Sequence, residues 1–335
     1  MSGSGAGAAT ERDHDVIVIG GGPAGLSGAV ALARSRRSVA VIDSGEPRNA
    51  PAAHMHNYLG REGLPPAELI KLGRTELAGY GGTLIDGSVT AAARDAERGG
   101  FVVDLADGRR LRSRRLLITT GLVDTLPPVP GVSDLWGRSV LHCPYCHGWE
   151  VRDTAIGVLA TSPMAAHQAL MFRQLSHDVI MFSHTTELGD DQRERLEARG
   201  IKIVDGEVVG LERDEADRLS GVVLASGRFV GRSTVVVGTI MEARADFLTP
   251  LGLSVEPVLA GEYRIGSRIV TDGNGATSVP GVWAAGNVAD PRAQVIVSAG
   301  AGLTAGAMIN ADLIEEETAA AVEHARSRTR QLSGA

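Results

Sequence analysis

The segment Gly20-Gly21-Gly22-Pro23-Ala24-Gly25 constrains the fold of this chain more than any other feature. Apolar residues 15–19 lead into it and residues 26–35 have helical composition, so G-x-G-x-x-G lies between a predicted strand and a predicted helix. A second predicted strand, 38–42, ends at Asp43, where a carboxylate can accept hydrogen bonds from a ribose. Glycines let a backbone approach a pyrophosphate, and the helix N-terminus offers free N–H groups. The sequence therefore predicts a dinucleotide-binding βαβ unit.

The rest of the chain repeats this alternation. Strands are predicted over 101–105 and 111–119, and a proline cluster at 126–131 reads as an inter-domain linker. A second αβ unit has strands at 155–160 and 178–182 around a helix at 163–176, and a buried strand at 282–287 precedes a helix from Gln294 through Ile314. The predicted fold class is α/β with two Rossmann-like domains. The dinucleotide domain is discontinuous, 1–124 and 249–335, and residues 125–248 form an inserted domain.

Composition limits the classes of partner. The 335 residues include 43 glycines and 4 % aromatics, as expected where backbones pack closely, and the formal net charge is -7 without a block of basic residues. We therefore expect no nucleic-acid and no membrane partner. The uncharged stretch 295–311 is shorter than the ~20 residues of a membrane span, and we expect a buried helix there. The N-terminus lacks the features of a secretory signal, which predicts a cytoplasmic protein with residues 1–14 disordered.

Both cysteines of the chain lie in the motif Cys143-Pro144-Tyr145-Cys146, which is followed by His147. Two cysteines in a C-x-x-C are typical of a redox or metal site rather than of a disulfide scaffold. Haem attachment is disfavoured because it needs export. Zinc binding through His142, the cysteines and His147 is disfavoured because adjacent ligands diverge in direction, and no metal is predicted. We predict Cys143, Cys146 and His147 as catalytic residues.

The order of these motifs resembles that of the low-molecular-weight thioredoxin reductases. Gly137-Arg138-Ser139-Val140 precedes the C-x-x-C and Gly148 follows it. The resemblance covers nearly the whole chain and implies bound FAD, a homodimer, and cysteines that exchange electrons with the flavin. The FAD contacts that it implies are Gly20, Gly22, Pro23, Ala24, Gly25, Asp43, Arg48, Asn57, Val89, Thr120, Gly121, Gly286, Asn287, Gln294 and Val295. Asn287 and Gln294 stand where the family has an acid and an arginine, which alters this site without abolishing it.

Three departures from the reductases bear on function. The loop that holds NADPH in that family reads Ala160-Thr161-Ser162-Pro163-Met164-Ala165, with both glycines replaced, and Ser183-His184-Thr185 stands where a basic pair is usual. Loss of the two charge-assisted contacts that the basic pair makes weakens NADPH binding by about 10² to 10⁴, which makes NADPH use doubtful. The third departure is His147, where reductases carry an acid. A histidine with a reference pKa of ~6.5 needs almost no adjustment to accept a proton near neutrality.

Together these departures resemble the dithiol oxidases of the gliotoxin and holomycin pathways. That resemblance implies a disulfide that takes electrons from a small dithiol and passes them through FAD to molecular oxygen, giving hydrogen peroxide. It also implies that Cys146 lies against the isoalloxazine, that Cys143 is the outer sulfur, and that His147 removes the substrate proton. A thioredoxin reductase with an unusual donor and a flavin-bound redox sensor remain alternatives. His54 and His56, on a predicted loop, are either solvated or close to flavin or substrate, and His142 has no assigned role.

Overall fold

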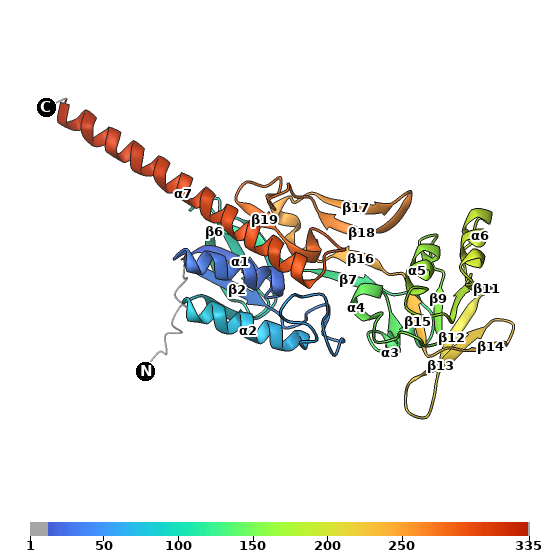
Figure 1. Cartoon of the computed structure of the whole chain (residues 1–335). Coiled ribbons are helices and arrows are strands. Elements are labelled where there is room, and N and C mark those ends of the chain that lie inside the picture. The colour runs from blue at the N-terminus through green and yellow to red at the C-terminus, as the bar shows by residue number, and fades with distance from the viewer. Residues whose placement is uncertain (1–12, 334–335) are drawn as a thin grey trace, which may run out of the picture.

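The computed structural model describes residues 13–333. Two lobes are joined by a narrow pair of strands, and a long C-terminal helix projects from the first lobe (Figure 1). The fold is α/β with two Rossmann-like domains, as the sequence predicts.

The first domain is built on a seven-stranded sheet in the order β3-β2-β1-β6-β5-β4, with β19 also paired to β6. Its strands are β1 (Asp13–Ile19), β2 (Val39–Asp43), β3 (Thr83–Asp86), β4 (Val89–Arg94), β5 (Phe101–Leu105), β6 (Arg110–Ile118) and β19 (Val282–Ala284). β1 pairs in parallel with both β2 and β6, and β19 continues the parallel pairing along β6 where β5 ends. The middle strands are buried on both faces, which explains their unbroken apolar sequences.

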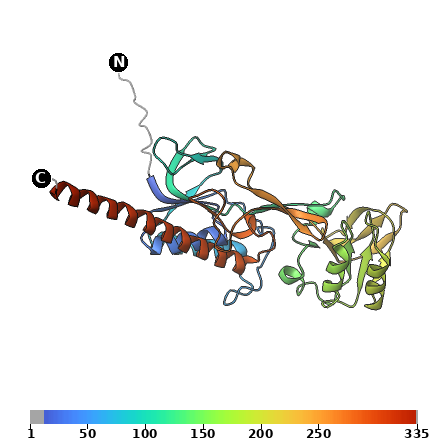
Figure 2. The ribbon, with the colours of Figure 1, turned by 90° about the horizontal axis from the view of Figure 1, so that it is seen from above.

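Helices α1 (Pro23–Arg34) and α7 (Val295–Ser333) cross one face of this sheet, beside α2 (Pro66–Gly79) (Figures 1 and 2). The contact between α1 and α7 is made backbone to backbone. A Cβ added at Gly302 would collide with the carbonyl of Ala24, and one at Gly306 would lie 2.7 Å from the carbonyl oxygen of Gly28. The short helix η2 (Gly286–Val288) lies between β19 and α7. Close helix contact therefore accounts for part of the high glycine content.

The inserted domain has a parallel sheet in the order β11-β10-β9-β15-β8 and a separate antiparallel sheet, β12-β13-β14. The parallel strands are β8 (Val140–Leu141), β9 (Ile156–Leu159), β10 (Val179–Phe182), β11 (Lys202–Val204) and β15 (Thr234–Val237). The antiparallel strands are β12 (Val208–Arg213), β13 (Leu219–Leu224) and β14 (Phe229–Gly231). The helices are α3 (Val132–Leu135), α4 (Pro144–His147), α5 (Ala165–Phe172) and α6 (Asp190–Ala198).

Two antiparallel strands, β7 (Leu122–Thr125) and β16 (Ile240–Ala243), carry the chain between the domains. They belong to a four-stranded sheet with the hairpin of β17 (Val255–Ala260) and β18 (Tyr263–Ile269). Ala245 and Leu248, at η1 (Asp246–Leu251), pack in the apolar core of the first domain, although the sequence assigned them to the inserted domain. The sequence placed that boundary too late because η1 has no strand or helix periodicity.

Helix α7 differs from its prediction in two ways. It continues to Ser333 rather than ending near Ile314, because Ala and Glu/Arg residues prolong the helical composition without a Gly or Pro. It is also not a buried helix: Val297, Leu303 and Ile314 are about half exposed. Within the part of the chain that the structure describes, 295–331 is one helix long and apolar enough to cross a membrane, a test that soluble core helices also pass.

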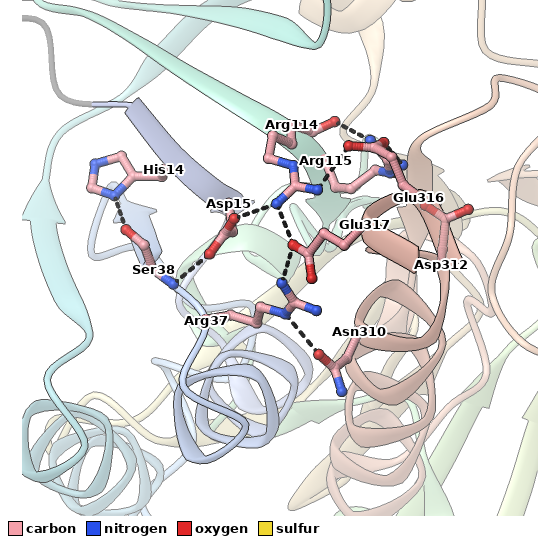
Figure 3. Close-up of polar contacts among 10 residues, drawn as sticks. All are labelled: His14, Asp15, Arg37, Ser38, Arg114, Arg115, Asn310, Asp312, Glu316 and Glu317. Carbon is pink, nitrogen blue, oxygen red and sulfur yellow. Dashed lines mark hydrogen bonds and ion pairs between the residues drawn. The ribbon is translucent and has the colours of Figure 1, made fainter. Parts of the chain in front are cut away.

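Ion pairs fasten α7 to the sheet where its apolar contact with α1 ends (Figure 3). Arg114 and Arg115 of β6 bind Glu316, and Arg115 also binds Asp312. Glu317 accepts hydrogen bonds from Arg37 and Arg114, which hold its pKa down at about 2. The charged residues beyond Ile314 thus give α7 a second attachment.

The predicted disorder of residues 1–14 lies mostly outside the described residues. It is wrong for Asp13 and His14, which begin β1. The His14 side chain is buried and lies 3.3 Å from the Ser38 hydroxyl.

Candidate active site

One cavity of about 1450 Å³ runs from the glycine-rich turn to the cysteine pair and is lined by both domains. This volume exceeds the roughly 300–1,000 Å³ of ordinary small-molecule sites, as an extended dinucleotide with a second ligand requires. The predicted residues that line it are Gly20, Gly22, Pro23, Ala24, Asp43, Arg48, Val89, Thr120, Gly121, Cys143, Cys146, His147, Gly286, Asn287, Gln294 and Val295. Gly25 and Asn57 are not among its lining residues.

The glycines of the nucleotide turn serve different purposes. Gly20 (φ 107°) leaves no room for a side chain against the carbonyl of Thr119, and Gly25 leaves none against the carbonyl of Gly20. Gly22, by contrast, has no atom within 4 Å of an added Cβ, and it lines the cavity at the N-terminus of α1. A side chain there would fill space open to a ligand. This cradle, with the free N–H groups of α1, fits a pyrophosphate.

Asp43 ends β2 at the edge of the cavity. The backbone N–H of Gly21 donates to Oδ1 of Asp43 at 3.0 Å, while Oδ2 lies 4.0 Å from Nη1 of Arg74. One carboxylate oxygen thus braces the glycine turn. The other faces a cation that also pairs with Asp86, and the lone pairs that remain can accept from ribose hydroxyls.

Asn287 lies at the opposite wall, beside the beginning of α7. Its Nδ2 donates to the carbonyls of Asp290 and Ala293 at 3.1 and 2.9 Å, so the amide nitrogen organises its own loop. The carbonyl oxygen of Asn287, a residue that lines the cavity, can accept from a ligand hydroxyl, as the acid usual at this position would. Gly286 (φ 77°) is required because a Cβ there would press on that of Ala24.

Cys143 is the N-cap of the short helix α4, Pro144 is its first residue, and Cys146 lies within it. Both cysteines are free, and their Sγ atoms lie 2.7 Å apart. The hydrogen bond from Cys146, the backbone N–H groups of Cys146 and Tyr145, and the charge of Arg48 lower the pKa of Cys143 to about 7. The same thiol contact and burial raise the pKa of Cys146.

This difference favours Cys143 over Cys146 as the thiolate of the reduced pair. In thiol–disulfide exchange, the sulfur whose thiol has the lower pKa is the better leaving group. A substrate thiolate is therefore favoured to attack Cys146 and to release Cys143. The resemblance implies the reverse, with attack on Cys143 and a Cys146 thiolate beside the flavin. The two assignments make different predictions for the serine variants, and the roles of the two sulfurs stay predictions here.

His147 follows Cys146 and lines the same cavity. Burial lowers its pKa, against the opposing charge of Glu150, so the neutral ring is favoured at neutral pH. Its Nε2 is buried without a hydrogen-bond partner among the described residues. A neutral imidazole with an uncommitted nitrogen can act as a proton acceptor.

A buried polar cluster beside the cysteines was not predicted. Arg48 makes a bidentate contact with Asp124 of β7, at 2.6 and 2.8 Å, and Thr239 donates to the same carboxylate at 2.8 Å. Burial alone would raise the pKa of Asp124, but Arg48 holds it below its ordinary value. Arg48, predicted as an FAD contact, is thus bound to the inter-domain strand. Sequence reasoning could not find Asp124 because it stands alone, without a motif.

His142 precedes the pair. Its Nδ1 lies 3.1 Å from the carbonyl of Val237, and burial lowers its pKa. A neutral ring must donate through Nδ1 to that carbonyl, which leaves Nε2 as an acceptor. Gln168 donates to the carbonyl of His142 at 2.7 Å and fixes the backbone before Cys143.

The loop 54–62 of the first domain lies close to α4. His54 is exposed and lines the cavity. His56 lies between Glu62 and Glu150, with N···O distances of 2.6 and 3.3 Å, rather than free in solvent. Asn57 (φ 60°) donates from Nδ2 to the carbonyl of Tyr145 at 2.5 Å, inside the C-x-x-C. The structure therefore brings Asn57 to the cysteine turn, whereas the sequence predicted a cofactor contact.

The altered nucleotide loop of the inserted domain lines the same cavity through Thr161 and Ser162. The Tyr263 hydroxyl donates to the carbonyl of Thr161 at 3.2 Å. His184, which stands where a basic pair is usual, accepts from the N–H of Val208, and burial lowers its pKa. Its neutral ring offers no fixed positive charge to a 2′-phosphate. Among residues 13–333, no group of three or more His, Cys, Asp or Glu is arranged to hold a metal ion.

Comparisons with known proteins agree with this geometry. Residues 14–303 match the pyridine nucleotide-disulphide oxidoreductase family. Thioredoxin reductase tcpT of Claviceps purpurea is 31% identical over 327 residues, covering 92% of this chain and 96% of that protein. Thioredoxin reductase sirT of Leptosphaeria maculans is 31% identical, and the match covers 91% of this chain and 96% of that protein.

Solved structures give the same result. The structure of HlmI is 47% identical with a TM-score of 0.88, covering 96% of this chain and 99% of its own. An oxidoreductase from Agrobacterium tumefaciens is 35% identical with a TM-score of 0.84, and the match covers 90% of this chain and 99% of that one. The resemblance to thioredoxin-reductase-like flavoproteins is confirmed, and FAD is the cofactor. The chain belongs to the pyridine nucleotide-disulphide oxidoreductase family, as a thioredoxin-reductase-like FAD oxidoreductase.

Proposed function

We propose that this protein is an FAD-dependent dithiol oxidase that closes an intramolecular disulfide in a small dithiol, with oxygen as electron acceptor. The observation that carries the proposal is the shared cavity. The FAD cradle, the cysteine pair and His147 open into one space, while the second nucleotide loop has lost its glycines and its basic pair. The overall reaction converts R(SH)₂ and O₂ into the cyclic disulfide RS₂ and H₂O₂.

The thiol half of the reaction follows from the chain's own residues. A substrate thiolate attacks the Cys143–Cys146 disulfide, breaking its S–S bond and forming a mixed disulfide with one cysteine. The second substrate thiolate attacks the substrate sulfur of that bond, which closes the product ring and leaves both cysteines reduced. His147 accepts a substrate proton, since only the thiolate is nucleophilic. Bound FAD supplies the two-electron acceptor that restores the cysteine disulfide and reduces oxygen.

The proposed substrate is a compact heterocyclic dithiol, such as a reduced dithiolopyrrolone of the holomycin type or a dithiodiketopiperazine. Its two thiols must reach one disulfide in succession, which favours a rigid molecule with both sulfurs close together. We place the reaction in the cytoplasm, because both cysteines belong to the redox pair and none is left for a structural disulfide.

We also propose a homodimer, with the outer face of α7 as its interface. Ile296, Leu303 and Ile314 are spaced seven and eleven residues apart, so they share one helical face opposite the face packed on α1. A second copy would present the same stripe, as a two-fold interface requires.

A thioredoxin reductase is the second candidate. Tyr145 and Trp149, beside the cysteine pair, are 66 % and 65 % exposed, and a protein substrate could contact them. Oxygen consumption with a small dithiol, compared with NADPH oxidation in the presence of thioredoxin, separates the candidates. A redox sensor would show neither activity over many turnovers.

A further inference from the structure

Away from the linker strands, two elements of the first domain reach across the cavity and hydrogen-bond the inserted domain, and Pro51 also packs closely against Gly137. The loop 54–62 contacts α4 from one side. The hairpin of β17 and β18 extends toward the inserted domain (Figure 1), and Tyr263 near its tip bonds the loop before α5. Each reaching element offers a side-chain donor to a backbone carbonyl of the other domain.

At α4 the contact falls within the C-x-x-C itself. Nδ2 of Asn57 donates to the carbonyl of Tyr145, one of the two residues between the cysteines. Glu62 holds the donor in place, because its Oε2 accepts from the N–H of Asn57 at 2.9 Å while its Oε1 lies 2.6 Å from Nδ1 of His56. Nε2 of His56 then reaches Glu150 at 3.3 Å, just beyond α4. The loop therefore touches the cysteine turn at its middle and beyond its end.

At the other contact, the Tyr263 hydroxyl donates to the carbonyl of Thr161. Thr161 belongs to the altered nucleotide loop, and both residues line the cavity. Thr161 is far from the cysteines in sequence, and Tyr263 bonds Thr161 rather than either cysteine. An effect of Tyr263 on the cysteine pair passes through the position of the inserted domain, or within it through α5, whose Gln168 donates to the carbonyl of His142.

We propose that Asn57 and Tyr263 are positioning residues that hold the inserted domain on the first domain with the cysteine pair inside the cavity. The two contacts lie on different loops of the inserted domain, so together they oppose rotation about the linker strands β7 and β16. Each is a single hydrogen bond, and its loss should raise the undocked population by about 2- to 10-fold. This inference does not depend on the proposed function.

The chain offers a clean test because its only two cysteines are the redox pair. The FAD-loaded protein is reduced and treated anaerobically with N-ethylmaleimide or with a polyethylene-glycol maleimide. Both reagents carry the same maleimide group, so a change in thiol reactivity alters both alkylation rates equally. The rate with the bulky reagent divided by the rate with the small one therefore reports how accessible the cysteines are. We expect Tyr263→Phe and Asn57→Gly each to raise this ratio by about 2- to 10-fold, and the double variant to multiply the two effects.

The controls match each substitution. Tyr80→Phe alters an exposed tyrosine of the first domain, and Arg36→Gly alters an exposed residue with φ 63°, close to that of Asn57. Glu150→Gln, which weakens the His56 contact, serves if Asn57→Gly fails to fold, and Glu68→Gln on α2 is its control. The proposal would be overturned if the ratio of alkylation rates for Tyr263→Phe were no larger than that for Tyr80→Phe. It would also be overturned if this ratio rose only in the variants at α4.

Discussion

Gly22 is the residue at which the nucleotide cradle can be tested without disturbing the protein's own packing. No atom lies within 4 Å of an added Cβ, so Gly22→Val should fold and yet fill the space of the pyrophosphate. We predict loss of most bound FAD, measured by the flavin-to-protein absorbance ratio, with little change in apoprotein melting temperature. Gly273→Val, at an exposed glycine that is also free of neighbours, is the control. Full flavin content in Gly22→Val would place the cofactor elsewhere.

The two cysteines should behave differently when each is replaced by serine. In Cys143→Ser the remaining thiol is Cys146, and by the resemblance it faces the flavin and should give a long-wavelength charge-transfer band. Because burial raises the pKa of Cys146, this band should grow with pH and become strong only at or above the ordinary thiol value of about 8.5. Visible spectra across pH test this. A band in Cys146→Ser instead would reverse the two roles. Both variants should lose turnover.

His147 should act in the thiol half-reaction alone. We predict that His147→Ala slows flavin reduction by dithiol by about 10² while leaving reoxidation by oxygen unchanged, as measured by stopped flow. His147 must be neutral to accept a proton, and burial lowers its pKa. The rate of flavin reduction by dithiol in the wild type should therefore fall only when the pH drops below about 6.5. Equal slowing of both half-reactions would remove His147 from this role.

Candidate site residues could be predicted where a motif carried them. The glycine turn, Asp43 and the C-x-x-C were found in this way, and the structure places them around one cavity. Asp124, Thr239 and Tyr263 could not be found, because their function arises only when strands and loops distant in sequence meet. Asn57 was noticed through the resemblance, but its contact with Tyr145 depends on how the two domains dock.

Helix α7 joins two surfaces of opposite character. Its inner face contacts α1 through glycines, and its outer face exposes Ile296, Leu303 and Ile314. We predict that Leu303→Asp shifts the protein from dimer to monomer in light scattering without lowering its melting temperature, because Leu303 makes no core contact within one copy. Leu72→Asp, at a partly exposed leucine of α2, is the matched control. A dimer that survives Leu303→Asp would place the interface on another face.

Elements with strong periodicity or clear boundaries could be predicted closely. β5 has the predicted bounds, and β9 and β10 begin one residue after theirs. The end of α7 could not, because near Ile314 the helix is held by ion pairs to β6, and the turns beyond them are exposed without an apolar pattern. The exposed stripe of α7 was read as core for a related reason: apolar composition does not say which surface covers it.

At the scale of the whole molecule, two domains share one cavity, and each contributes half of the proposed chemistry. The first domain holds the FAD cradle, and the inserted domain carries the cysteines and His147. A reductase needs a second nucleotide to reach the flavin, whereas an oxidase needs only a dithiol and oxygen. The loss of glycines at 160–165 and the neutral His184 are consistent with the second arrangement.

Oxygen uptake is the most direct test of this account. The purified flavoprotein is supplied with a reduced dithiolopyrrolone or dithiodiketopiperazine, and oxygen consumption and hydrogen peroxide are recorded, with a monothiol as control. In parallel, NADPH oxidation is followed in the presence of oxidised thioredoxin. The account predicts many turnovers with the dithiol, one H₂O₂ per disulfide formed, and no NADPH oxidation above background. Rapid NADPH-dependent reduction of thioredoxin without dithiol-driven oxygen uptake would contradict it.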